Sequence, residues 1–184
     1  MTALPTLSTD RLRVRPLRAA DEPAVLALDR DAAPERRQRW LAWQVAGYRE
    51  LELLTQPPYG ERGIELAETG ELIGLAGLVP SLGPFALLDT WPRNPDVDAA
   101  RRFLPAVGLY WMLHPAVRGR GYATEAARAL VGFAFAELRL TRIVATTEHA
   151  NAASQAVMRR LGMRLERNPE PEPAWFQVVG ILDA

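Results

Sequence analysis

An apolar run, a turn rich in glycine and arginine, and an amphipathic stretch follow one another over residues 107–138. The run at 107–113 has bulky and aromatic residues over the length of a strand, and Pro115 disfavours helix at His114, so we expect the strand to end there. From Ala123 onward apolar residues recur every three or four positions, as in a helix that packs on a sheet. The sequence therefore predicts a strand, a tight turn and a helix.

The turn at 118–123, RGRGYA, has the composition of an anion site. Its glycines allow the backbone to approach a ligand closely, the first amides of the following helix are unpaired donors, and the helix dipole with two arginines favours negative charge. The alternative is a tight connection with solvated arginines. The glycine fingerprint of dinucleotide-binding folds and the phosphate loop of nucleoside triphosphatases are absent from the sequence. A coenzyme that presents a diphosphate without a metal is therefore a better candidate ligand than a nucleoside triphosphate.

Two motifs carry a resemblance to a known family. Arg118, Gly121 and Ala123 fill the pattern Q/R-x-x-G-x-G/A, which resembles the acyl-CoA pyrophosphate loop of the GNAT N-acetyltransferases, and 113–126, LHPAVRGRGYATEA, is similar to the branch with the ribosomal-protein N-terminal acetyltransferases. Residues 151–163 resemble the later helix of that branch, N-x-x-S-x-x-V-x-x-x-L-G-M. A weaker likeness extends over nearly the whole chain, from 11–17 to the last strand.

The resemblance implies the fold class α/β (α+β). This is the GNAT-like acyl-CoA N-acyltransferase fold, in which a central mixed, mostly antiparallel twisted sheet is splayed at its fourth and fifth strands and flanked by helices. The length of 184 residues suits one domain, so we predict a single GNAT acetyltransferase domain over 1–184.

Local patterns along the chain predict the other elements. We expect strands at 11–17, 63–68, 71–79, 142–147, 164–167 and 175–182, a helix capped by Asp21, one or two helices in 35–54, and a helix from Asn151 to a C-cap at Gly162. The proline-rich segment 80–103 is predicted to be a loop, with a turn of helix near 98–102. A functional or mobile loop, a surface insertion and a dimer contact all remain open for this segment.

Composition narrows the range of functions. The 22 basic and 22 acidic residues balance, which argues against nucleic acid and membrane surfaces as partners. The absence of cysteine excludes disulfides, thiolate zinc sites and a cysteine nucleophile, and with only two histidines we expect no metal site. The first residues lack the apolar core of a signal peptide, and no apolar run approaches the roughly 20 residues of a membrane span, so we expect a cytoplasmic protein.

The resemblance also implies which residues bind the acetyl-CoA donor. The main chain at the end of the central strand would hold the pantetheine arm, the turn and the helix start would hold the diphosphate, and the later helix would reach the coenzyme near its sulfur. The predicted cofactor-binding residues are Met112, Leu113, His114, Arg118, Gly119, Arg120, Gly121, Tyr122, Ala123, Thr124, Asn151 and Ser154. Ser154 is the predicted catalytic acid, because no tyrosine follows Tyr122. N-capping by Asn151 and an exposed serine remain the alternative for these two residues.

The proton acceptor stays unassigned. Many relatives place a glutamate on the substrate-facing side of the fourth strand, where this chain has Ala106, Gly108 and Tyr110. The alternatives are a water chain and four side chains, although side chains of these types are more often solvated or incidental: Glu68, Glu148, Glu172 and His149. We expect the His114 imidazole to be a spectator.

Aromatic residues in 35–54 leave a further choice open. Trp40, Trp43 and Tyr48 fall where the family places its acceptor side, but aromatics at helical spacing more often belong to a core.

The prediction is an acetyl-CoA-dependent N-acetyltransferase that acts on a primary amine, as a monomer or a homodimer. A protein N-terminus, as in the ribosomal-protein branch, is the first expected acceptor, and a small amine or amino-acid derivative is the second. A non-catalytic acyl-CoA-binding module is the alternative from another class, because the fourth-strand carboxylate is missing.

Overall fold

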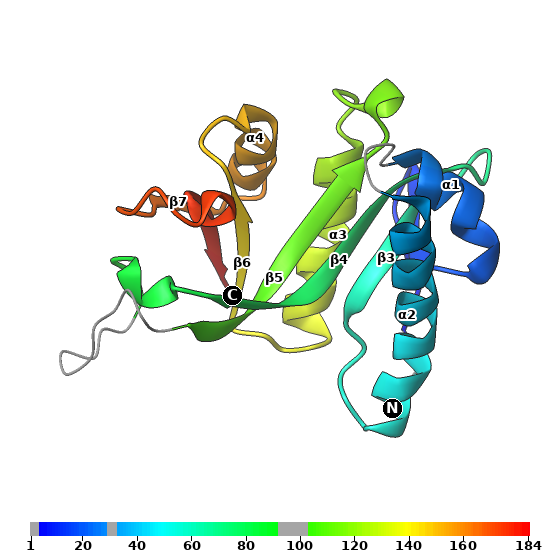
Figure 1. The fold of residues 1–184 in the computed structure, drawn as a ribbon, viewed down its shortest axis with the longest axis horizontal. Coiled ribbons are helices and arrows are strands. Elements are labelled where there is room, and N and C mark those ends of the chain that lie inside the picture. The colour runs from blue at the N-terminus through cyan, green and yellow to red at the C-terminus, as the bar shows by residue number, and fades with distance from the viewer. Residues whose placement is uncertain (1–3, 29–32, 92–102) are drawn as a thin grey trace. The chain divides into compact units, whose positions relative to one another are not determined.

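The computed structural model describes residues 4–28, 33–91 and 103–184, which form a mixed α/β fold (Figure 1). The strands are β1 (Leu7–Ser8), β2 (Leu12–Pro16), β3 (Gly60–Leu66), β4 (Leu72–Gly83), β5 (Leu104–Leu113), β6 (Arg142–Thr147), β7 (Arg164–Arg167) and β8 (Val178–Asp183). The α-helices are α1 (Glu22–Leu28), α2 (Pro34–Leu53), α3 (Tyr122–Ala136) and α4 (Ala152–Arg160). Short 3-10 helices are η1 (Ala19–Asp21), η2 (Phe85–Leu87), η4 (Pro115–Val117) and η5 (Ala174–Phe176).

The strands hydrogen-bond in the order β1-β2-β3-β4-β5-β6-β8-β7. β5 runs parallel to β6 and pairs with it at Gly108 and Val144, whereas β1–β2, β2–β3, β3–β4, β6–β8 and β7–β8 are antiparallel. This mostly antiparallel sheet confirms the predicted fold class. The fourth and fifth predicted strands are β5 and β6, and the splay between them stays a prediction.

Two compact units make up the chain. The first comprises Met1–Val79 and Tyr110–Leu138, and the second comprises Pro80–Leu109 and Arg139–Ala184, so β4 and β5 each contribute to both. The single domain over 1–184 stays a prediction.

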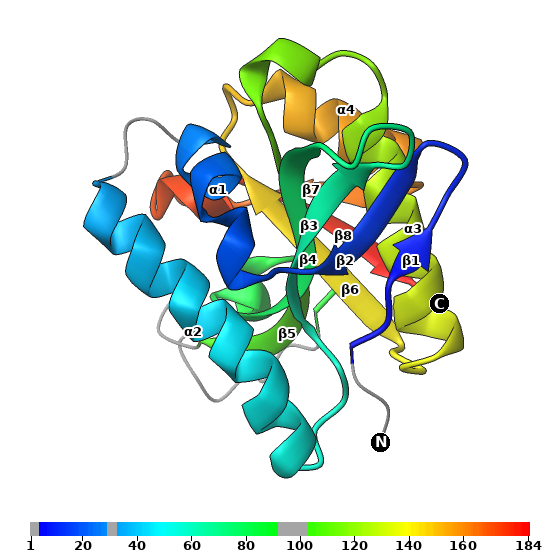
Figure 2. The same cartoon turned by 90° about the vertical axis from the view of Figure 1, so that its right-hand side faces the viewer.

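In the first unit, helices cover both faces of the strands. Figure 2 shows α1 and α2 on one side of β2 and β3, and α3 on the other. On the α1 and α2 side lies a core of Leu17, Val25, Leu28, Leu41 and Leu75. On the α3 side, the guanidinium of buried Arg62 lies 4.8 Å from the centroid of the Phe133 ring. The amphipathic pattern predicted from Ala123 onward is therefore satisfied by α3.

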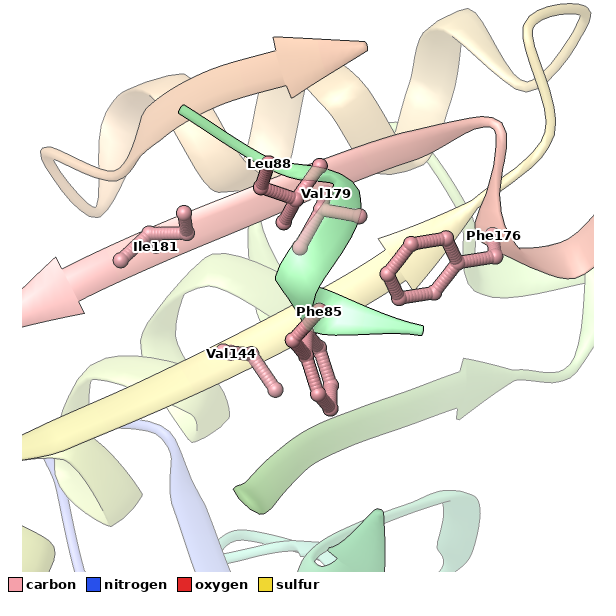
Figure 3. Packing of buried hydrophobic residues seen from close by; sticks show 6 residues of the cluster. All are labelled: Phe85, Leu88, Val144, Phe176, Val179 and Ile181. Atoms are coloured by element: carbon pink, nitrogen blue, oxygen red, sulfur yellow. The ribbon is translucent and has the colours of Figure 1, made fainter. Parts of the chain in front are cut away.

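The second unit corrects the prediction that 80–103 is a loop. β4 continues to Gly83, and η2 follows it. Phe85 and Leu88 are buried in a cluster with Val144, Phe176, Val179 and Ile181 (Figure 3). The aromatic side chains stabilise this segment more than its prolines disrupt it, so its first part is core and not a surface insertion. The turn of helix expected near 98–102 lies outside the described residues.

Other predicted elements need smaller changes. The first strand is preceded by β1, and the closing strand begins at Val178 because the residues before it form η5. The expected N-cap role of Asp21 is wrong, since its carboxylate accepts hydrogen bonds from the Arg18 amide at 2.7 Å and from the Arg15 guanidinium at 2.8 and 2.9 Å. The segment 35–54 forms one helix, α2. The hairpin with Gly70 at positive φ is confirmed.

Candidate functional site

The turn between β5 and α3 has a backbone that requires glycine at two positions. Gly119 and Gly121 have φ angles of +79° and +84°, a region in which side chains with a Cβ are strained. A Cβ placed on Gly119 would meet no atom within 4 Å, so this side of the turn is open. The sequence therefore sets the shape of the turn and leaves space beside it.

The amides that follow the turn have no acceptor in the described part of the chain. The N-cap of α3 is Gly121, which has no capping side chain, and the first bond inside the helix joins the Glu125 amide to the Gly121 carbonyl at 3.0 Å. The amides of Tyr122, Ala123 and Thr124 precede this bond and have no acceptor among the described residues. Three free donors at the positive end of a helix dipole form a binding site for an anion.

Two arginines of the turn add positive charge. Arg118 and Arg120 are exposed, and neither forms an ion pair with a described residue. The Arg118 Nε donates to the carbonyl of Leu113 at 3.1 Å, which leaves its two terminal nitrogens for a ligand. Amides and terminal guanidinium nitrogens that have no acceptor among the described residues suit a diphosphate, so this donor set fits the coenzyme that the motifs predict.

Two main-chain groups at the end of β5 have partners among the described residues. The His114 amide donates to the Ile73 carbonyl of β4 at 2.9 Å, and the Leu113 carbonyl accepts from the Arg118 Nε at 3.1 Å, so binding of the pantetheine arm by the main chain of 112–114 stays a prediction. The side chain of Met112 packs against the core under α1 and α2. The His114 Nδ1 accepts from the Ala116 amide at 3.3 Å and so caps η4. The spectator role expected for the His114 imidazole stays a prediction.

A network that sequence reasoning missed surrounds the same turn. The guanidinium of Arg11 binds the Glu125 carboxylate and donates to the Arg120 carbonyl at 3.2 Å, and Thr9 donates to Glu125 at 2.6 Å. Burial raises the pKa of Glu125, but these hydrogen bonds outweigh it and hold the pKa below its usual value. No local signal could find this network, because its members lie more than 100 residues apart.

Asn151 and Ser154 lie in the second unit, whereas the turn lies in the first. The Asn151 Oδ1 accepts from the Ser154 amide at 3.0 Å, which confirms the predicted N-cap of α4. The Ser154 hydroxyl is half-buried and has no hydrogen-bond partner among the described residues. It is therefore free to donate, while contact of Asn151 with a coenzyme stays a prediction.

The four predicted candidates for the proton acceptor are spread over exposed loops. Glu68, Glu148, Glu172 and His149 are exposed, and Glu172 accepts from the Ala174 amide at 3.1 Å. Glu61 of β3 differs from them, because burial raises its pKa from 4.5 to about 7 against the smaller effects of the Arg37 guanidinium and the Trp40 indole. Nothing in the sequence distinguishes Glu61 from other acidic residues, since the shift depends on burial.

The aromatic residues of α2 have different environments. The Tyr48 hydroxyl accepts from the Leu17 amide at 3.1 Å and donates to the Glu61 carbonyl at 2.5 Å, so it ties α2 to β3. Trp40 and Tyr48 pack against the core, whereas Trp43 is 68% exposed, which makes the core expectation wrong for Trp43.

Two classes of feature are absent from the described ranges. Within 4–28, 33–91 and 103–184, no helix is both long and apolar enough to cross a membrane. No group of three or more histidine, aspartate and glutamate side chains in these ranges could hold a metal ion.

Comparisons with solved structures show the same fold. The chain is similar to an acetyltransferase from Agrobacterium tumefaciens, with 28% identity and a TM-score of 0.70 over 100% of this chain and 97% of the other. It is also similar to the ribosomal-protein-S5-alanine acetyltransferase of Vibrio fischeri (16% identity, TM-score 0.68, 97% and 96% covered). A third similar structure is Mycobacterium smegmatis RimJ in complex with CoA-disulfide, with 21% identity and a TM-score of 0.63 over 94% of this chain and 82% of the other.

Comparisons of sequence identify the family. The uncharacterized N-acetyltransferase YnaD of Bacillus subtilis is 43% identical over 56 residues, which is 30% of this chain and about a third, 33%, of that relative. Residues 11–164 match the family model described as acetyltransferase (GNAT) domain. The chain belongs to the GNAT acetyltransferase family, as its two motifs predicted.

Proposed function

We propose that this protein transfers an acetyl group from acetyl-CoA to a primary amine. The observation that carries this proposal is the uncapped start of α3, where the amides of 122–124 follow Arg118 and Arg120, two arginines that form no ion pair with a described residue. The donor brings the thioester and the diphosphate. Residues 118–124 would hold the diphosphate, and the main chain of 112–114 would hold the pantetheine arm. That RimJ of Mycobacterium smegmatis binds CoA-disulfide on a similar fold supports the assignment.

The transfer needs three events at the reacting atoms. The amine nitrogen attacks the thioester carbon, so that a C–N bond forms and the C–S bond breaks, and one proton leaves the nitrogen as the thiolate departs. A main-chain amide near Leu113 would polarise the thioester carbonyl. Ser154, whose hydroxyl is unpaired in the described residues, would donate a proton or hydrogen bond to the sulfur.

Glu61 is our proposed proton acceptor, directly or through water. A carboxyl group that is half protonated near neutral pH can accept a proton from an ammonium more readily than an ordinary carboxylate can. Glu61 adjoins Trp40 and Tyr48, which pack on the same cluster as Tyr110 and Met112 of β5. The cluster therefore links Glu61 to the strand that would carry the donor.

The proposed acceptor is a protein N-terminus of the ribosomal-protein type. The similar fold of the Vibrio fischeri ribosomal-protein-S5-alanine acetyltransferase is compatible with this choice, and the motif resemblance favours it. A small amine or amino-acid derivative is the second candidate. Parallel assays with N-terminal peptides and with small amines would separate the two, since a preference of either class in kcat/KM identifies the acceptor.

Calorimetric titration with acetyl-CoA tests the donor site. In Gly119→Glu a carboxylate would stand beside the free amides, so we expect the binding seen in the unchanged protein to be lost. Gly70→Glu is the matched control, because Gly70 also has positive φ, +74° against +79°, and also faces open space. Equal affinity of both variants, or no binding by the unchanged protein, would contradict the proposal.

Glu61→Gln tests the proton acceptor in two ways. We expect kcat to fall while the affinity for acetyl-CoA stays unchanged, and Glu71→Gln on the exposed hairpin serves as the control. The raised pKa means that folding favours the protonated form of the Glu61 carboxyl. The contribution of this group to the free energy of unfolding is therefore fully present below pH 4.5 and is lost as the pH rises through about 7. Glu61→Gln should therefore raise the free energy of unfolding at pH 8 by up to about 3 kcal/mol. An unchanged kcat at saturating substrates would remove Glu61 from the mechanism.

A further inference from the structure

We propose that Arg11 and Thr9 hold the Glu125 carboxylate away from the free amides of α3, and so keep the turn at 118–124 open for an anion. Arg11 and Thr9 are thus positioning residues for the donor site. The identity of the anion as the diphosphate of acetyl-CoA rests on the proposed function, whereas the role of the network does not.

The Glu125 carboxylate accepts hydrogen bonds on both oxygens from Thr9 and Arg11, which lie between β1 and β2. Its Oε1 accepts from the Thr9 hydroxyl at 2.6 Å and from the Arg11 amide at 3.1 Å. Its Oε2 accepts from the Arg11 Nε at 2.7 Å and lies 2.5 Å from the Arg11 Nη2. Both oxygens are therefore held by one short segment of chain, and the side chain of Glu125 is 19% exposed.

Without these donors, Glu125 would compete with a bound anion. It lies in the first turn of α3, where a carboxylate is attracted to the unpaired amides and to the positive end of the helix dipole. The amides of 122–124, which have no acceptor in the described parts of the chain, are donors of that kind in the same first turn. A released Glu125 would occupy them or repel the phosphates, so the donor site would inhibit itself.

Arg11 also contacts the turn directly. Its Nη1 donates to the Arg120 carbonyl at 3.2 Å, and its guanidinium carbon lies 4.7 Å from the centroid of the Tyr122 ring. A Cβ on Gly121 would lie 3.5 Å from its Nη2. These contacts give Arg11 two separable effects, which are to neutralise Glu125 and to support the shape of the turn. Only the first effect predicts that removing the charge of Glu125 compensates for the loss of Arg11.

The test compares Arg11→Ala, Glu125→Gln and the double variant Arg11→Ala/Glu125→Gln. Arg13→Ala is the matched control, because Arg13 lies close to Arg11 in the chain, has the same side-chain exposure of 49% and pairs with a carboxylate, that of Glu65, away from the turn. Calorimetry with acetyl-CoA and with inorganic pyrophosphate gives the affinities. Thermal unfolding of each variant shows that it is folded.

We expect Arg11→Ala to weaken binding of both probes by about tenfold, because an unpaired carboxylate then lies at the helix start. The double variant should regain most of this loss, and Arg13→Ala should bind as the unchanged protein does. A double variant as weak as Arg11→Ala, or an Arg11→Ala variant with full affinity, would overturn the proposal. If the unchanged protein binds pyrophosphate but not acetyl-CoA, the proposed function fails. The relative affinities of the variants for pyrophosphate then still decide whether Arg11 keeps Glu125 away from the amides.

Discussion

The two helices that begin near predicted motif residues start in opposite ways. The N-terminus of α4 is capped by a side chain of the adjoining sequence, because the Asn151 Oδ1 accepts from the Ser154 amide at 3.0 Å. α3 begins at Gly121, which has φ of +84° and no capping side chain, so three amides stay free among the described residues. A missing cap costs about 1 kcal/mol of stability. The chain bears this cost at α3, where an anion can satisfy the amides, and avoids it at α4.

The largest expected effect on acetyl-CoA binding comes from reversing the charge of the arginines that precede α3. Arg118→Glu combined with Arg120→Glu should weaken acetyl-CoA binding by about 100-fold, since two attractive charges become repulsive beside the amides. Calorimetry at low and at physiological ionic strength measures the loss, which salt should reduce. Arg36→Glu with Arg39→Glu on the exposed side of α2 provides a control of equal charge. Similar losses in both pairs would show that global charge, and not the turn, governs binding.

An intermediate effect is expected from the hydroxyl on α4. Ser154→Ala keeps the amide that Asn151 caps, so stability should not change, but kcat should fall by about tenfold if the hydroxyl protonates the departing sulfur. Steady-state rates at saturating acetyl-CoA measure this, together with the denaturation midpoint. An unchanged kcat would show that the Ser154 hydroxyl does not take part in the reaction.

The smallest effect concerns the cap itself. Asn151→Ala should lower the free energy of unfolding by about 1 kcal/mol, because the Ser154 amide loses its acceptor. Asn151→Asp, which keeps an oxygen at this position, is the control for urea denaturation. A loss of acetyl-CoA affinity in both variants would indicate a coenzyme contact through the side-chain nitrogen. Equal stability of all three proteins would argue that the cap contributes nothing.

Prediction from sequence succeeded where neighbouring residues carry the signal. The hairpin at 69–70, the cap at Asn151 and the amphipathic face of α3 each follow from a few adjacent residues. It failed for Phe85, because the prolines around it indicate a loop while its ring packs 5.2 Å from that of Phe176. It also failed for Trp43, since helical spacing cannot tell which face of α2 meets a core.

The sequence by itself determined the strand, turn and helix of 107–138, the two motifs and the family. These depend on backbone preferences and periodicity, which are local properties. Only the tertiary structure decided that Arg11 meets Glu125, 114 residues further along the chain, and that burial raises the pKa of Glu61 to about 7. Both depend on which groups folding brings together and how far it removes them from water, and no local pattern encodes that.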